Sequence, residues 1–289
     1  MHSAKHLLLA ALLGLATPGL AQQEETFTEI DPGLDALDPD RLMAAVQSGD
    51  ARAMNNVGLM WAQGVKVPKV DFQEAIRWWK EAARRGYAVS MNNLGLAYAN
   101  GHGVKQDYQQ ALKWWEMAAE KGNAWAMNSI GDLYENGLGV AQDYGEARDW
   151  YERAADAGDA LAMYNLGHFY ERGLGVEANL KAALGWYERS ADKGLALSMH
   201  AAGKLIEQGR GLPADPAEAH AWFTVAAQYF GAQEKDDAAA NQEALAALGA
   251  RLDRAQLARA QEIARNLQAR IEERRKARPP RAGPGESET

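Results

Sequence analysis

Apolar and small residues recur along this chain with the spacing of short helices arranged in pairs. Between residues 91 and 98, Met91, Leu94, Ala97 and Tyr98 are three or four positions apart, which places them on one side of a helix. Gly101-His102-Gly103-Val104 follows, and we expect the helix to end there because glycine adopts backbone angles that other residues resist. The pattern predicts a helix, a glycine turn and then a second helix.

The second helix of each pair is marked by its two ends and by adjacent aromatic residues. Four of these helices begin with Asp followed three residues later by Glu or Gln, a spacing at which two side chains can satisfy free helix N–H groups: Asp71/Glu74, Asp107/Gln110, Asp143/Glu146 and Asp215/Glu218. The fourth in order has only the single cap Asn179. The aromatic pairs are Trp78-Trp79, Trp114-Trp115, Trp150-Tyr151, Trp186-Tyr187 and Trp222-Phe223. Gly86, Gly122, Gly158 and Gly194 occupy the left-handed position that commonly follows a helix.

A glycine near the middle of the first helix recurs at an almost constant interval. It is found at Gly58, Gly95, Gly131, Gly167 and Gly203, so the interval is 37 residues once and then 36 residues three times. A period of this size indicates a repeat array. A glycine inside a helix costs about 1 kcal/mol relative to alanine, so five at matching positions require a tertiary reason. We expect each one to allow a bulky aromatic residue of the second helix to approach closely.

These motifs resemble those of the Sel1-like repeat family, a relative of the tetratricopeptide repeat. The fourth copy carries the family pattern at Ala160, Leu166-Gly167, Tyr170, Gly173-x-Gly175-Val176, Ala183, Trp186-Tyr187 and Gly194. The first loop lacks the second glycine, and the fifth copy has Ile206 in place of the tyrosine and Leu212-Pro213 in its loop. The resemblance implies an all-α fold, an α/α right-handed superhelix of about five helix-turn-helix repeats over residues 50–230, with helical caps.

The two ends of the chain differ from the repeats. Residues 1–21 read as a signal peptide, with Lys5, an apolar run at residues 7–15 and small residues before a predicted cleavage after Ala21. Residues 22–37 read as a flexible lead-in, and residues 38–49 as an N-terminal half-repeat cap. Residues 231–278 are expected to form a C-terminal helical cap, and residues 279–289 a disordered tail. The mature chain is therefore expected to be periplasmic or secreted.

Composition narrows the possible functions. The chain has no cysteine, so neither disulfides nor thiol chemistry are available to it. Its net charge of −8 argues against nucleic acid as the main partner, because phosphate binding needs a basic surface. No stretch after the signal peptide approaches the roughly 20 apolar residues of a membrane-spanning helix. We expect no cofactor.

Two residue patterns could suggest chemistry, and both have a simpler structural interpretation. Ser190-Ala191-Asp192-Lys193 has the Ser-x-x-Lys spacing of penicillin-binding enzymes. However, Ser190 stands where Ala82, Ala118 and Ala154 stand in other repeats, and the chain contains neither Ser-Asp-Asn nor Lys-Thr-Gly. The mature chain's four histidines, His102, His168, His200 and His220, show no short metal-ligand spacing. We therefore assign neither catalytic nor metal-binding residues, although His168 and His200 could approach each other.

The variable positions of the first helix are the best candidates for partner binding. Residues at i, i+4 and i+7 share one helix face. Their sequence neighbours fill the regular core positions, so this stripe is expected to face away from the core and, by the family resemblance, to line a concave groove. The partner-binding candidates are Asn92, Leu96, Asn128, Asp132, Glu135, Tyr164, His168, Glu171, His200 and Lys204.

The resemblance implies a non-catalytic adaptor or scaffold of the cell envelope, which binds a partner protein in the groove and regulates envelope signalling or assembly. Tyr164, His168 and Lys204 are the contacts we favour. The alternative is a hydrolase or binder of β-lactams or peptidoglycan, as attributed to some Sel1-like proteins. A third hypothesis is an interaction that depends on pH through the histidines, because histidine changes charge near neutrality.

Overall fold

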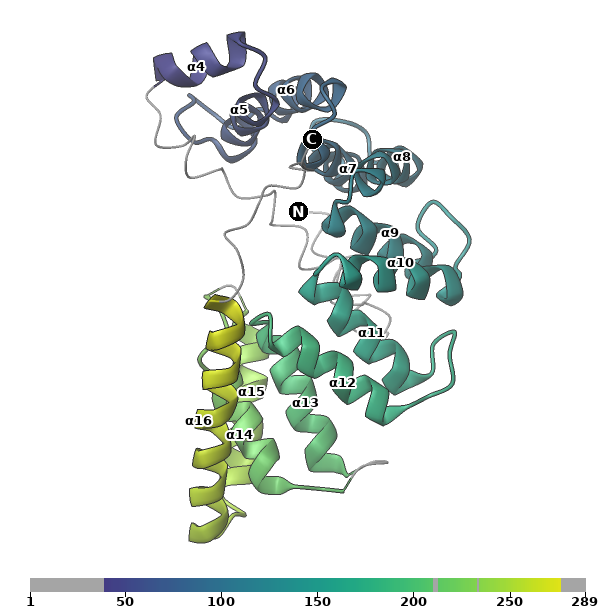
Figure 1. Ribbon diagram of the computed structural model, residues 1–289. Coiled ribbons are helices and arrows are strands. Elements are labelled where there is room, and N and C mark those ends of the chain that lie inside the picture. The colour runs from purple at the N-terminus through teal and green to yellow at the C-terminus, as the bar shows by residue number, and fades with distance from the viewer. Residues whose placement is uncertain (1–38, 210–212, 233, 277–289) are drawn as a thin grey trace. The chain divides into compact units, whose positions relative to one another are not determined.

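The computed structural model describes residues 39–209, 213–232 and 234–276, and the described residues form helices joined by turns (Figure 1). No strand occurs within those ranges. The thirteen described helices, in chain order, are α4 (Pro39–Gln47), α5 (Ala51–Gln63), α6 (Phe72–Arg84), α7 (Ala88–Asn100), α8 (Tyr108–Glu120), α9 (Ala124–Asn136), α10 (Tyr144–Asp156), α11 (Ala160–Arg172), α12 (Leu180–Ala191), α13 (Ala196–Gln208), α14 (Pro216–Ala226), α15 (Lys235–Gly249) and α16 (Arg254–Lys276). The all-α prediction is confirmed.

Helices α5 to α14 form five consecutive pairs, in which we call α5, α7, α9, α11 and α13 the A helices and α6, α8, α10, α12 and α14 the B helices. The helix ends follow the sequence signals. Asp71, for example, accepts hydrogen bonds from the backbone N–H groups of Gln73 and Glu74, while Asn179 accepts one from Ala182. Gly86, Gly122, Gly158 and Gly194 all have the left-handed backbone expected of them.

The central glycines of the A helices lie directly against the second aromatic residue of each B helix. A Cβ atom added at any of them would stand only 2.5 to 2.9 Å from ring atom Cδ1 of that aromatic residue, and the pairs are Gly58–Trp79, Gly95–Trp115, Gly131–Tyr151, Gly167–Tyr187 and Gly203–Phe223. The five aromatic side chains are completely or almost completely buried. The expectation of a close helix approach at these glycines is confirmed, and it explains why the helix tolerates a residue of poor helix propensity.

In unit 1, the second and third loops between A and B helices pack against the preceding repeat. A Cβ atom at Gly103 would lie 2.7 Å from Cβ of Phe72 at the start of α6, and one at Gly139 would lie 2.6 Å from Cβ of Tyr108 at the start of α8. Both glycines also have positive φ. The first loop has Lys66 at the equivalent position, with φ of +57°. Glycine is therefore required in the second and third loops by both backbone angle and space.

The chain divides into two compact units, which we describe separately. The described part of unit 1 is residues 39–157, and that of unit 2 lies within residues 158–276. In unit 1, Leu42 and Val46 of α4 pack with Ala53, Met54 and Val57 of α5. In unit 2, Leu267 and Ile271 of α16 belong to the core that contains Trp222 and Phe223 of α14. Each end of the repeat series is thus covered by a further helix.

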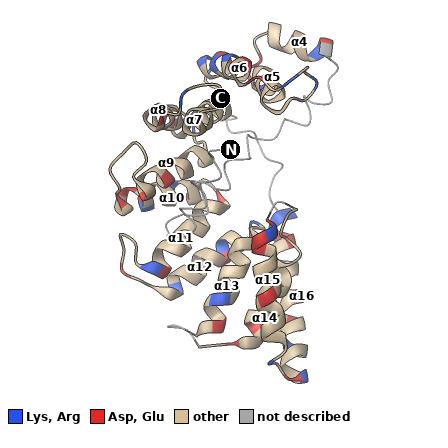
Figure 2. Cartoon of the chain, turned by 180° about the vertical axis from the view of Figure 1, so that it is seen from behind, with Lys and Arg blue, Asp and Glu red and all other residues tan. Residues whose placement is uncertain are grey.

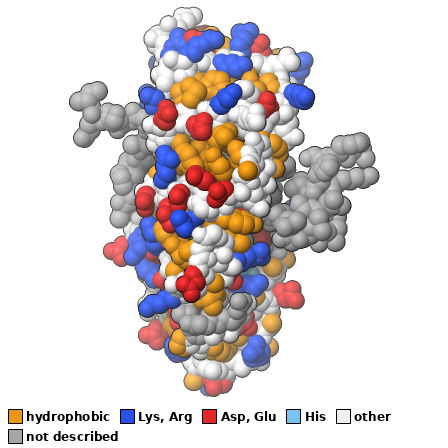
Figure 3. Space-filling view, turned by 90° about the vertical axis from the view of Figure 1, so that its right-hand side faces the viewer, with side chains coloured by type: hydrophobic (Ala, Val, Ile, Leu, Met, Phe, Trp, Pro, Cys, Tyr) orange, Lys and Arg blue, Asp and Glu red, His pale blue; other side chains and the backbone are white. Residues whose placement is uncertain are grey.

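The surface of both units is mixed in character. Acidic and basic residues occur on most helices (Figure 2), and on the face shown in Figure 3 apolar patches alternate with charged groups. Four large apolar side chains are exposed among the described residues: Met43, Val65, Val70 and Met117. In the described parts of the chain, no helix combines the length and the apolar character needed to cross a bilayer.

Candidate functional site

The structure divides the ten candidate residues into a buried and a partly exposed group. The buried group consists of Asn92, Leu96, Asn128, Asp132 and Glu135, all in unit 1. The group in unit 2 has partial or full exposure and consists of Tyr164, His168, Glu171, His200 and Lys204. The expectation that the whole stripe faces away from the core is therefore wrong for the five residues of unit 1.

Neighbouring helices explain the burial in unit 1. Helix α7 contacts its own B helix α8, the preceding B helix α6 and the next A helix α9. Eleven of the thirteen residues of α7 are buried, so these neighbours cover nearly its whole circumference. The periodicity of a single helix distinguishes one packed face, but it does not report a second or third helix on the other faces.

The polar residues of the stripe in α9 bind a buried tyrosine. The hydroxyl group of Tyr151 lies 2.6 Å from Oδ1 of Asp132 and 2.6 Å from Oε2 of Glu135, and the Asn128 side chain donates to the other oxygen of Asp132 at 3.2 Å. Burial, followed by the two carboxylates, raises the pKa of Tyr151 well above its ordinary value. The hydroxyl group has a single proton, so the two carboxylates share one hydrogen-bond donor, and this shared contact stabilises the packing of α9 against α10.

The same arrangement recurs in unit 2. The hydroxyl group of Tyr187 donates to Oε2 of Glu171 at 2.7 Å. In repeats one and two the buried aromatic is a tryptophan, and the position of Glu171 is held by Ala62 and Ala99. In repeats three and four a carboxylate thus occupies this position where tyrosine replaces tryptophan, whereas in repeat five Glu207 accompanies Phe223 and accepts a hydrogen bond from Arg251 at 3.4 Å instead. The joint change in repeats three and four is visible in the sequence and indicates which side chains pair, but it does not indicate whether the pair is buried, as Glu135 is, or partly exposed, as Glu171 is.

Tyr164 is the partly exposed aromatic residue among the candidates in unit 2. Its ring lies 5.6 Å from the ring of Tyr187, with the two planes tilted by 41°. Burial raises the pKa of Tyr164 to about 12, assisted by the negative charges of Asp237 and Glu171. Tyr164 therefore keeps its proton at physiological pH and can donate a hydrogen bond. Asp237 belongs to α15, so this helix lies close to the candidate stripe.

His200 is oriented by a second residue of α15. The side-chain amide of Asn241 donates to the carbonyl oxygen of Phe223 at 2.9 Å, which directs its oxygen towards Nδ1 of His200 at 3.0 Å. Nδ1 must therefore carry the proton, and in the neutral ring Nε2 keeps its lone pair. Burial lowers the pKa of His200, with a smaller contribution from Lys204. His200 is neutral at pH 7 and presents a hydrogen-bond acceptor.

His168 is also neutral at pH 7, because burial and the nearby Arg172 lower its pKa. Lys204 is exposed on α13. Within the described ranges, no group of three or more histidine, aspartate or glutamate side chains is arranged to hold a metal ion. The candidate surface of unit 2 therefore offers a phenol, two neutral imidazoles, a carboxylate and an ammonium group. Such a set suits hydrogen bonding to a partner.

The Ser-x-x-Lys motif lies inside unit 2 rather than at its surface. Ser190 is 0% exposed, and its hydroxyl group donates to the carbonyl oxygen of Ala160 at 2.6 Å. It also accepts a hydrogen bond from Ser198 at 2.6 Å. A nucleophile must meet its substrate and have its proton removed by a base. Ser190 instead connects α12 to the start of α11, so the observation that favoured a β-lactam-directed enzyme is explained by packing.

Comparisons with known proteins agree with this fold. The Sel1 repeat profile matches residues 51–87, 88–123, 126–159, 160–195 and 196–228. A Sel1 repeat protein from Oxalobacter formigenes has 31% identity and a TM-score of 0.60 over 68% of this chain and 80% of its own. The structure of c5321, a protective antigen of uropathogenic Escherichia coli with an SLR fold, has 24% identity and a TM-score of 0.68 over 83% of this chain and 51% of its own. No curated protein matches the sequence.

Proposed function

The chain belongs to the Sel1 repeat family, and from this we propose that it is a non-catalytic scaffold of the cell envelope that binds a partner protein through unit 2. Sel1 repeat proteins are generally protein-interaction scaffolds. The observation that carries the proposal is the exposed part of the A-helix stripe. We call Tyr164, His168, Glu171, His200 and Lys204 the unit 2 stripe.

The unit 2 stripe has the chemistry of a protein interface rather than that of an active site. Tyrosine provides a large contact surface with few rotatable bonds and a polar tip, and it is enriched in binding hot spots. The packing of Tyr164 on Tyr187 and the hydrogen bond of His200 to Asn241 hold both rings before a partner arrives. This preorganisation reduces the conformational entropy lost on binding.

The location in the envelope rests on residues 1–21. Their positive charge, short apolar run and small residues before Ala21 are typical of a signal peptide. We infer that the chain is exported, cleaved after Ala21 and held in the periplasm or secreted, where it regulates envelope signalling or assembly. A fusion of residues 1–21 to a reporter that is active only outside the cytoplasm tests the export step. An inactive reporter would contradict it.

The binding site is tested by crosslinking the exported chain in an envelope extract and isolating it with its partners. The Tyr164→Ala/His168→Ala/Lys204→Ala variant is compared with a control, Lys181→Ala/Gln256→Ala/Arg265→Ala, which changes three exposed residues elsewhere in unit 2. A partner is identified by mass spectrometry, purified and titrated against each variant. Loss of at least tenfold in affinity for the stripe variant alone supports the proposal. Equal affinity for both variants contradicts it.

A further inference from the structure

The loop between α5 and α6 has an unusual composition for an exposed turn. Its sequence is Val65-Lys66-Val67-Pro68-Lys69-Val70, which contains three valines and two lysines but no acidic residue. Val65 is 37% exposed and Val70 is 49% exposed, and they are two of the few large apolar side chains exposed in the described part of the chain. Both lysines are exposed as well. The loop therefore presents apolar and cationic side chains together.

Backbone hydrogen bonds hold this loop in a defined conformation. The N–H group of Val65 donates to the carbonyl oxygen of Met60 at 3.0 Å, and that of Asp71 donates to Trp61 at 2.9 Å. Gly64 closes helix α5 in the left-handed conformation, with the side chain of Val70 beside it. The exposed valines thus belong to an ordered turn that is fastened at both ends.

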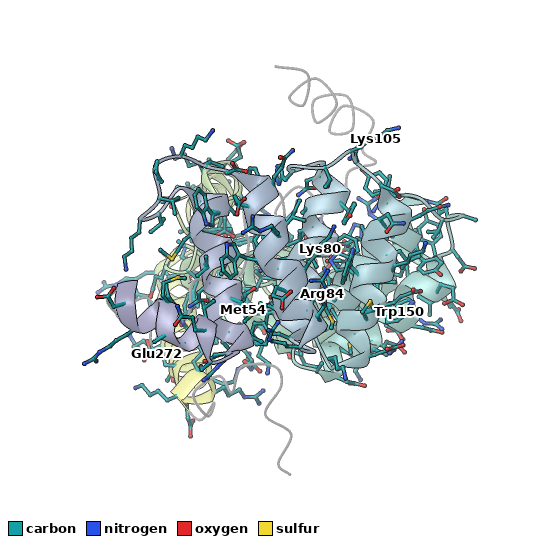
Figure 4. The ribbon with its side chains drawn as sticks, turned by 90° about the horizontal axis from the view of Figure 1, so that it is seen from above. Met54, Lys80, Arg84, Lys105, Trp150 and Glu272 are labelled. Carbon is teal, nitrogen blue, oxygen red and sulfur yellow. The ribbon has the colours of Figure 1, made fainter. Side chains whose placement is uncertain are left out.

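The loop between α7 and α8 extends the same edge of unit 1. Gly103 lies against Phe72, the first residue of α6, and the ring of His102 stacks on that of Phe72 with 4.6 Å between centroids. This loop adds Lys105, which is exposed and points away from the helices (Figure 4). We call Val65, Lys66, Lys69, Val70 and Lys105 the lysine–valine edge.

The acidic residues closest in sequence to the lysine–valine edge are engaged by helix ends. Asp71 and Asp107 each cap a B helix, and their carboxylates accept backbone N–H groups of the first turn. The positive end of the helix dipole offsets their charge. The next loop of unit 1 holds Leu138, Val140 and Ala141 without a lysine, so the cationic character is confined to the first two loops.

We propose that the lysine–valine edge rests on an anionic phospholipid surface, with Val65 and Val70 entering the headgroup layer and the lysines meeting lipid phosphates. Peripheral proteins bind membranes by this combination of apolar insertion and cationic attraction. A folded protein partner suits the edge less well, because each side of a stable protein interface contains about 20 to 30 residues, whereas the lysine–valine edge has only five. The inference goes beyond the scaffold function and does not depend on a protein partner.

The proposal is tested by co-sedimentation of the exported protein with lipid vesicles. The vesicles contain either pure phosphatidylcholine or a mixture with phosphatidylglycerol. Lysine near an anionic surface strengthens binding roughly fivefold per residue, so we expect Lys69→Glu/Lys105→Glu to weaken partitioning at least tenfold. Val65→Ser/Val70→Ser is expected to weaken it severalfold. Thermal melting by circular dichroism verifies that each variant is folded.

Matched controls separate this edge from general charge and apolarity. Lys113→Glu/Lys121→Glu makes the same charge change on and after α8, and Met117→Ser removes an equally exposed apolar side chain. Both controls are expected to bind as the unchanged protein does. Equal weakening by edge and control variants, or equal binding to both kinds of vesicle, would overturn the proposal. So would complete displacement by free glycerol phosphate at constant ionic strength, because that result indicates a soluble anion site.

Discussion

Replacing Gly167 by alanine tests whether the central glycine of an A helix is required for the close approach of the aromatic residue on its B helix. A Cβ atom at this position would lie 2.5 Å from Cδ1 of Tyr187, whereas ordinary contacts begin near 3.4 Å. Cε1 of the ring would lie closer still, so the ring would have to retreat by at least 0.9 Å. It has little room to do so, because Tyr187 is buried, packs on Tyr164 and donates to Glu171.

The expected change in the free energy of unfolding of Gly167→Ala is the sum of three contributions. Alanine improves helix propensity by about 1 kcal/mol relative to glycine. Overpacking a well-filled core costs about 1–3 kcal/mol. Displacing the ring also weakens its hydrogen bond to Glu171, and a hydrogen bond to a charged group is worth about 1.5–3 kcal/mol. The losses exceed the gain, so we expect Gly167→Ala to destabilise unit 2 by about 1–3 kcal/mol.

Gly185 is the matched control, because it lies on α12 of the same repeat and a Cβ atom there would meet no atom within 4 Å. Gly185→Ala should therefore stabilise the protein by up to about 1 kcal/mol. Urea unfolding followed by circular dichroism measures both variants. Opposite shifts of the unfolding midpoint support the reasoning. A rise in the midpoint for both variants would refute it, because Gly167 would then have no packing role.

The remaining predictions concern α16, the first loop and pH. Asp192→Asn removes the carboxylate that pairs with Arg270 and Arg274 of α16. After discounting for the exposure of the two arginines, we expect the free energy of unfolding to fall by about 1–2 kcal/mol. Amide hydrogen exchange in α16 should become faster. Lys66→Gly should stabilise unit 1 by about 1 kcal/mol, because Lys66 has φ of +57°, and a lower melting temperature would contradict this. In the folded protein the pKa values of His168 and His200 lie below the ordinary 6.5. The contribution of these histidines to stability is therefore complete above pH 6.5 and is lost as the pH falls through the folded-state values. We expect His168→Gln/His200→Gln to flatten the dependence of the melting temperature on pH below 6.5.

Much of the fold could be predicted from local signals. Caps such as Asp71 and Asn179, and glycines such as Gly122, act on their own helix ends, so their effect can be read without knowledge of distant residues. The central glycines were also informative about packing, because a helix tolerates them repeatedly only where another residue occupies the space. Gly95 against Trp115 fulfils this prediction directly.

The candidate surface was less predictable, because exposure depends on how many neighbours surround a helix. Asp132 and Glu135 look like a solvated face in the sequence, yet they are buried acceptors for Tyr151. Glu171 binds Tyr187 in the same way and remains partly exposed. The difference between interior and surface is a property of the assembled repeats, and no single helix encodes it.

The repeat, its helix ends and the positions where backbones approach are encoded locally in the amino-acid sequence, because propensity, capping and glycine spacing act over a few residues. Packing between helices, by contrast, sets which polar positions are buried and which remain exposed. Packing also sets the tautomer of His200, which depends on Asn241 of α15, 41 residues away. Such contacts arise from packing between elements that are distant in sequence, and local patterns carry no information about their geometry.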